Sequence, residues 1–401
     1  MISHRHILAI AVPIVISNVS TPLIGLVDTA VMGRLEDAAY IGAIALGAII
    51  LNFLFWGLGF LRMSTTALTA QAQGAGDNDE IRASLARAMA IAIAAGAIMI
   101  ALQLPLNTIA FALVEATDKV ENLSSEYFNI RIWSAPAVLS NYVVLGWFIG
   151  LGQSGKALVI QLFLNGVNLV LDIYFVLGLG FDVTGVGAAS VIAEYSALAL
   201  GLWLMMRELR QRSGVFGLAK LLDRAKLRRT MAINRDIMIR TLCLIFAFSW
   251  FTAQAAKSGD VILAANAILL NFITLSAFFL DGFAVAAETL VGQSMGANNR
   301  AAFKRVVKLS ALWAFAISIC VSLVFWFAGE YVIDFLTINT EVRNSASIYL
   351  PWAAAAPVVA ILAYQARIQD FRATETPKRL RYSPAVRPIV ARKVRLKAEA
   401  S

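Results

Sequence analysis

The residues with the clearest chemical potential are acids that stand inside long apolar stretches of the sequence. Ionisable groups at membrane depth are costly to bury, so they are candidates for function. Because a low dielectric favours the neutral form of a carboxyl group, such an acid can exchange a proton near neutral pH. It can equally accept a sodium ion or an organic cation, and mutual exclusion among these three gives exchange. Five acids meet this description: Asp28, Asp172, Glu194, Asp281 and Glu288.

One of these acids has polar companions at helical spacing. Asp172 follows Asn168 by four residues, so a helix places both side chains on one face. A carboxylate and a carboxamide form an oxygen-rich patch that suits a hard cation or a shared proton. Ser190, in the next apolar run, adds a hydroxyl. The alternative interpretation is a hydrogen-bonded cluster that only holds helices together.

Other chemistries lack the residues they need. The sequence has no nucleophile paired with a base, no phosphate-binding glycine loop before a basic residue and no HExxH motif. Its two cysteines, Cys243 and Cys320, and its two histidines, His4 and His6, cannot build a disulfide framework or a Cys/His metal site. We therefore expect neither an enzyme nor a protein with a cofactor.

The composition is that of a membrane protein. Of the 401 residues, 59% are hydrophobic and 15% are charged, against about 45–50% and about 25% in soluble domains. Ten apolar runs are long enough to cross roughly 30 Å of hydrocarbon as helices. We therefore predict an all-α multispanning membrane protein. The predicted spans are about 7–32, 40–66, 85–113, 128–150, 157–179, 186–206, 234–256, 261–290, 306–328 and 346–365.

The lysine and arginine positions predict the orientation. With a cytoplasmic N-terminus, 18 of the 34 basic residues fall in connectors on the cytoplasmic side and five in connectors on the other. Ten of the 18 lie between Arg207 and Arg240. The excess predicts that the N-terminus and this long connector are cytoplasmic. It does not indicate nucleic-acid binding, because no basic stripe is interleaved with surface aromatic residues.

The chain contains an internal repeat. Residues 51–53 (Leu-Asn-Phe) return at 270–272, and the Gln-x-x-Gly-Ala segment at 71–75 returns at 293–297, with offsets of 219 and 222 residues. Six helices precede the long connector, and an even number returns the chain to its starting side. The halves are therefore predicted to be parallel repeats, related by an axis along the membrane normal. The Gln-x-x-Gly-Ala segments are interpreted as helix ends that pack at the cytoplasmic side.

The repeat also relates the remaining charged residues. It places Arg62 opposite Asp281, which predicts an ion pair between the halves, or else a pair that only neutralises a buried charge. Glu288 follows Asp281 by seven residues, which is about 10 Å along one helix face. Glu194 either faces a cavity or reaches toward an interface. These four residues are the candidates for a second site or an interlobe pair.

The repeat predicts the domain organisation and an early ending. Two further helices should follow near 378–400 and 407–427, but residues 366–401 carry ten Lys/Arg and no run that could cross a bilayer. We expect a truncation or frameshift after about Gln365, with a native basic tail as the alternative. The predicted parts are an N-lobe of six transmembrane helices at 1–210, a basic cytoplasmic connector at 211–233, an incomplete C-lobe of four transmembrane helices at 234–365 and a basic non-membrane tail at 366–401.

Three motifs carry a family resemblance. Leu26–Leu35 (LVDTAVMGRL), Gln71–Gly76 (QAQGAG) and Phe279–Gln293 (FLDGFAVAAETLVGQ) resemble the multidrug and toxic compound extrusion (MATE) family, and the last resembles its DinF branch. The resemblance covers about residues 7–365. It implies twelve spans in two six-helix lobes around a central cavity. It also implies a monomer of the inner membrane that expels small organic cations in exchange for protons or sodium.

The same resemblance implies a site in the N-lobe. The family combines an aspartate on the first helix, an asparagine and an aspartate one turn apart on the fifth, and a hydroxyl residue, usually threonine, on the sixth. Asp28, Asn168, Asp172 and Ser190 match these positions. They would carry the coupling proton, or hold a sodium ion through Asp28, Asn168 and Asp172.

These expectations make a secondary active efflux antiporter the leading hypothesis. One alternative is a lipid-linked sugar flippase of the same superfamily, which would favour a cationic cavity over these acids. The other is a non-transporting product of a disrupted transporter gene.

Overall fold

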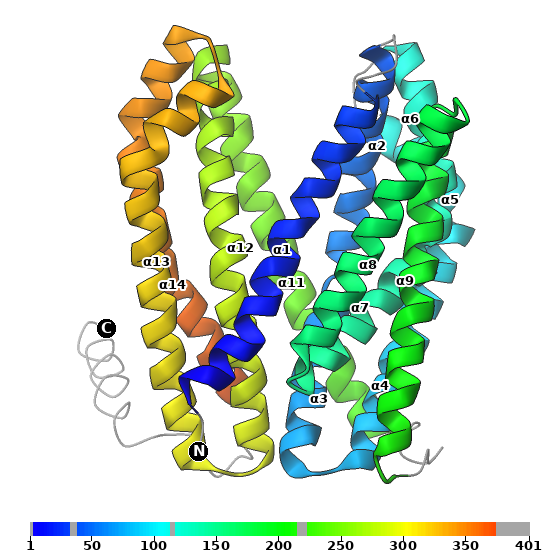
Figure 1. Ribbon diagram of the computed structural model, residues 1–401, viewed down its shortest axis with the longest axis vertical. Coiled ribbons are helices and arrows are strands. Elements are labelled where there is room, and N and C mark those ends of the chain that lie inside the picture. The colour runs from blue at the N-terminus through cyan, green and yellow to red at the C-terminus, as the bar shows by residue number, and fades with distance from the viewer. Residues whose placement is uncertain (1–2, 33–37, 113–116, 215–222, 374–401) are drawn as a thin grey trace, which may run out of the picture.

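The computed structural model describes residues 3–32, 38–112, 117–214 and 223–373, and all the secondary structure they form is helical (Figure 1). The helices of the first half are α1 (His4–Met32), α2 (Ala38–Gly57), α3 (Phe60–Ala75), α4 (Asn78–Ala101), α5 (Gln103–Ala112), α6 (Asp118–Arg131), the short η1 (Ile132–Ser134), α7 (Ala135–Gly150), α8 (Ser154–Asp172), η2 (Ile173–Gly178) and α9 (Val183–Gln211). Those of the second half are α11 (Arg224–Lys257), α12 (Asp260–Gly296), α13 (Arg300–Leu336) and α14 (Thr340–Ala373).

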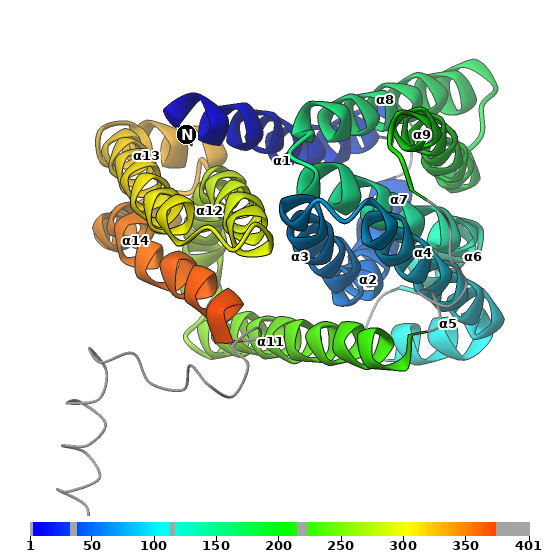
Figure 2. The ribbon, with the colours of Figure 1, turned by 90° about the horizontal axis from the view of Figure 1, so that it is seen from below.

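The helices form two bundles, an N-lobe of α1–α9 and a C-lobe of α11–α14. Seen from below, α3 and α12 face each other at the centre, while α1 and α11 run along opposite sides and reach from one bundle toward the other (Figure 2). Helix α12 packs against both α1 and α3, and α11 also contacts α3. The first helix of each half therefore helps to join the two lobes.

Helix boundaries preserve the repeat that the sequence predicts. Helices begin at Ala38, Asn78 and Asp118, and their counterparts begin at Asp260, Arg300 and Thr340, each 222 residues later. In the first half, each of the three helical segments that begin at these residues is interrupted, giving the pairs α2–α3, α4–α5 and α6–α7. In the second half the corresponding helices α12, α13 and α14 are each continuous.

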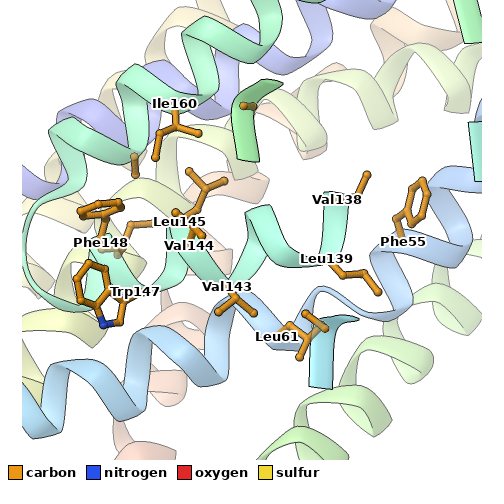
Figure 3. Packing of buried hydrophobic residues seen from close by; sticks show 14 of the residues in the cluster. Phe55, Leu61, Val138, Leu139, Val143, Val144, Leu145, Trp147, Phe148 and Ile160 are labelled. Carbon is orange, nitrogen blue, oxygen red and sulfur yellow. The ribbon is translucent and has the colours of Figure 1, made fainter. Parts of the chain in front are cut away.

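Helix α7 is the centre of the N-lobe. It packs against α3, α4, α8 and α9, and nearly all of its side chains are buried. A helix that is apolar on every side is expected in such a position. The rings of Trp147 and Phe148, both fully buried, meet edge to face with 5.0 Å between their centroids. Figure 3 shows these rings with Leu145 and Ile160 in the surrounding cluster.

Seven helical segments among the described residues are long and apolar enough to cross a membrane. The protein is thus a multispanning helical membrane protein, as predicted, and the numbers of six and four spans stay predictions. The predicted ends differ from the observed ones: spans placed at 40–66 and 261–290 continue to Ala75 and Gly296. Polar residues extend these helices beyond the apolar runs. The predicted ends were taken from those runs, so they fall short of the observed helix ends.

The helices that follow these extensions, α4 and α13, have side-chain caps at their N-termini. The Asp77 carboxylate accepts a hydrogen bond from the backbone of Glu80 at 2.9 Å, and the Asn299 side chain accepts one from Ala302 at 2.9 Å. Side chains of this kind satisfy the free N–H groups of a helix start. The caps fix the beginnings of α4 and α13, each directly after a Gln-x-x-Gly-Ala segment.

Helix α14 continues past the predicted boundary at Gln365 and ends at Ala373. Residues 374–401 lie outside the described residues, so the predicted basic tail and its origin stay predictions.

The lobes meet mainly at one end of the molecule, which we call the closed end. It holds the turns between α3 and α4 and between α12 and α13, and from it the two bundles diverge (Figure 1). Phe283, Leu290 and Val291, in the second part of α12, belong to the same apolar cluster as the N-lobe core. Leu269 and Phe272, in its first part, belong to a separate cluster within the C-lobe.

The orientation of the closed end can be tested by cysteine labelling. Ser213, just after α9 at this end, and Ser258, between α11 and α12 at the opposite end, are both exposed. In a variant whose native Cys243 and Cys320 are replaced by serine, Ser213→Cys should resist a membrane-impermeant maleimide in intact cells, whereas Ser258→Cys should react. Permeabilised cells should label both. The reverse pattern in intact cells would contradict a cytoplasmic N-terminus.

Candidate functional site

Three of the predicted site residues lie together inside the N-lobe. Asn168 and Asp172 are on α8 and Ser190 is on α9, and their exposed fractions are 4%, 0% and 6%. The Asn168 side-chain amide donates a hydrogen bond to the Ser190 hydroxyl, with 3.4 Å between Nδ2 and Oγ. The spacing in the sequence thus corresponds to a buried polar group that joins two helices.

Asp172 occupies a special place in this group. It is the last residue of α8, and the chain continues directly into the π-helix η2. Wider π-helical turns are rare and are frequent at functional sites. Together with the Asn168 amide and the Ser190 hydroxyl, the buried carboxyl group of Asp172 provides oxygens that suit a proton or a hard cation.

Asp28 lies on a helix that is held against this group. Helix α1 packs on α8, and the Asn165 side-chain amide donates a hydrogen bond to the Ser20 hydroxyl at 3.0 Å. The backbone of Asp28 is helical, but its side chain lies outside the described side chains. Its proximity to Asp172 stays a prediction.

The second group of predicted residues lines a pocket between the lobes. Arg62 comes from α3, and Asp281 and Glu288 come from α12, so the pocket carries one basic and two acidic side chains at the seam. Arg62 precedes Gly74 by twelve residues, which places it about 18 Å from the closed end along the helix. The predicted ion pair between Arg62 and Asp281 stays a prediction. The remaining lining residues are Ile14, Met63, Thr66, Ile149 and Val285.

Glu194 belongs to neither group. Its side chain is held in the N-lobe by Asn141, whose amide donates to Glu194 Oε2 at 2.8 Å and to the Glu194 backbone carbonyl at 3.0 Å. The Arg131 guanidinium lies 3.9 Å from Glu194 Oε1. Arg131 also donates a hydrogen bond to Ser134 and lies over the ring of Phe55. The structure therefore places Glu194 in a buried network of α6, α7 and α9.

Two members of this network, Arg131 and Asn141, were not among the residues predicted from the sequence. Arg131 lies within the predicted span at 128–150, but the sequence pattern does not show where its long side chain reaches. Asn141 is a polar residue in the middle of the apolar run at 128–150, and this signal could have identified it.

We expect that Asn141→Leu destabilises the protein through Glu194. The substitution removes the donor to a buried carboxylate, and an unsatisfied buried polar group costs about 1–3 kcal/mol. Thermal unfolding of the purified protein in detergent should show a lower midpoint. The same substitution in a Glu194→Leu background should cost less, because coupled residues give non-additive effects. Equal losses in the two backgrounds would show that Asn141 acts through other contacts.

Comparisons with known proteins agree with this arrangement. The family model described as MatE matches residues 13–174 and 237–382. The chain is 38% identical to DNA damage-inducible protein F of Escherichia coli over 363 residues, which are 90% of this chain and 79% of that protein. It is 26% identical to the multidrug resistance protein MdtK of Edwardsiella ictaluri, over 73% of this chain and 65% of that protein.

The fold has counterparts among solved structures. One described as the outward-facing conformation of a multidrug resistance MATE family transporter of the MOP superfamily superposes with a TM-score of 0.82 at 17% identity. The match covers 91% of this chain and 82% of that one. At this level of identity the likeness concerns the fold alone.

Proposed function

Because the chain belongs to the MatE family of membrane transporters, we propose that it is a secondary active antiporter that exports small organic cations in exchange for protons or sodium ions. As a family member it is a transporter, not an enzyme, and a multi-pass protein of the inner membrane. The mode of exchange, the coupling ion, the substrates and a monomeric state are parts of the proposal.

The observation that carries the proposal is the complete burial of Asp172 beside Asn168 and Ser190. One carboxylate in an apolar interior can be neutralised by a proton, a sodium ion or an organic cation, but by only one of them at a time. This competition couples the movement of one cation to that of another. Asn168 and Ser190 supply further oxygens for a hard cation, and Asp28 would supply a second carboxylate.

The two lobes provide the means of alternating access. Parallel repeats related by an axis along the membrane normal are a known transporter plan, in which the halves rock around a site near the midplane. Here the helix starts of the two halves follow a constant offset, and the contacts between the lobes concentrate at the closed end. Separation at this end and approach at the other would expose the sites alternately.

The pocket charges favour a cationic substrate over the flippase alternative. Two acidic residues, Asp281 and Glu288, and one basic residue, Arg62, line the seam, so acidic side chains outnumber basic ones there. An anionic lipid-linked sugar would require an excess of basic ones. The name of the MdtK relative, a multidrug resistance protein, supports export of drugs rather than flipping of lipids.

Removing the two aspartate charges should abolish transport. We expect Asp28→Asn and Asp172→Asn each to reduce dye efflux from proteoliposomes to background, because asparagine is nearly isosteric but cannot cycle a proton or neutralise a cation. Asp118→Asn, at an exposed helix start, is the matched control and should retain wild-type efflux.

The efflux assay distinguishes the proposed antiporter from its alternatives. Wild-type rates in both aspartate variants, under either a proton or a sodium gradient, would contradict the assignment of this site. A wild-type protein that moves no dye under either gradient would favour the non-transporting product.

A further inference from the structure

The two Gln-x-x-Gly-Ala segments contact each other across the seam between the lobes. A Cβ atom built on Gly74 would lie 1.9 Å from the backbone oxygen of Gln293, and one built on Gly296 would lie 2.0 Å from the backbone oxygen of Gln71. No side chain fits at such distances, so both positions require glycine. We call these four residues the glycine clasp.

The contact is reciprocal. Gln71 and Gln293 are equivalent in the repeat, as are Gly74 and Gly296, with an offset of 222 residues in each case. Each glycine therefore packs on the first residue of the other copy of its own motif, as in the self-complementary interface of a two-fold dimer. Small residues of this kind let two membrane helices approach backbone to backbone.

A polar contact accompanies the clasp. The Gln293 side-chain amide donates a hydrogen bond to the backbone oxygen of Gly150, at the end of α7, with 3.0 Å between the atoms. Gln293 thus reaches from the C-lobe into the N-lobe. The clasp consists of dispersion contacts and hydrogen bonding between uncharged groups, and individual dispersion contacts are weak. The clasp itself contains no ion pair, whereas Lys226 at the start of α11 pairs with Glu80 at the start of α4 at the same end.

We propose that the glycine clasp is the gate that closes this end of the molecule, and that its opening exposes the seam to the adjacent aqueous phase. The inference rests on the proposed function, since a gate presupposes transport. Glu288, which lines the interlobe pocket, precedes Gly296 by eight residues, or about 12 Å of helix. The clasp therefore lies between the pocket and the aqueous phase at the closed end.

The geometry makes the gate sensitive to a single methyl group. A Cβ at either glycine would overlap a backbone oxygen, which belongs to a helix and cannot turn aside as a flexible side chain can. The closed arrangement must then widen, whereas the state open at this end is unaffected. Gly74→Ala or Gly296→Ala should therefore shift the population toward that open state.

Spin-label distance measurements test this directly. Ala75 and Ala297 are exposed beside the clasp, one on each lobe. In the full chain with Cys243 and Cys320 replaced by serine, we would label Ala75→Cys and Ala297→Cys and record the distance distribution by double electron–electron resonance. The main distance should lengthen in Gly74→Ala and equally in Gly296→Ala. Gly155→Ala and Gly166→Ala are matched controls, because an added Cβ at either position meets nothing within 4 Å.

A second label pair reports on the opposite end. Thr117 and Ser258 are exposed there, one in each lobe. Cysteines at these two positions should come closer in the glycine variants if the lobes rock as rigid bodies. An unchanged distribution at Ala75 and Ala297 in a folded glycine variant would overturn the proposal.

A further variant covers the case in which an added methyl prevents folding. Gln293→Leu keeps the backbone and the side-chain volume but removes the hydrogen bond to Gly150, so it should lengthen the Ala75–Ala297 distance in the same direction. An unchanged distance there, with neither glycine variant folded, would count against the gate. A lengthened distance in a protein without dye efflux would support the gate and contradict the transport proposal, so the two failures are distinguishable.

Discussion

Lipid chains are as apolar as leucine, so helices in a bilayer associate through close packing and hydrogen bonds rather than by expelling water. The arrangement of this protein depends on how near the backbones of α3 and α12 can come to each other. Gly74 and Gly296 set that approach, and they do so at one end only. The divergence of the bundles toward the opposite end (Figure 1), the division of the C-lobe core into two parts and the pocket at the seam all accompany this one contact.

The two groups of predicted site residues differ in position: one lies within the N-lobe and the other lies at the seam between the lobes. Asn168, Asp172 and Ser190 are buried within the N-lobe, so their geometry can persist while the lobes move. Arg62, Asp281 and Glu288 come from both lobes, so movement of the lobes must change their distances. A transporter built this way would hold its cation in a rigid site and sense its own conformation at a deformable one.

Much of this fold could be predicted from the sequence because its signals are local or periodic. Apolar runs indicate the helices, and the 222-residue offset appears both in the motifs and in the helix starts. Helical spacing grouped Asn168 with Asp172, and the family resemblance added Ser190 to the group. The network of Arg131, Asn141 and Glu194 escaped prediction because it joins three helices, and no periodicity encodes which faces meet. The role of Gly74 was likewise hidden, since helix ends often contain glycine for their turns alone.

The reciprocal contact also bears on how such a chain could have arisen and diverged. In a dimer of two identical halves, any residue at the axis would meet its own copy, and a charge there would face the same charge. In the fused chain, the seam holds an arginine from one half and acids from the other, while the glycines remain alike. Covalent joining of duplicated halves therefore frees each to evolve separately, so that a symmetric hinge can coexist with an asymmetric interior.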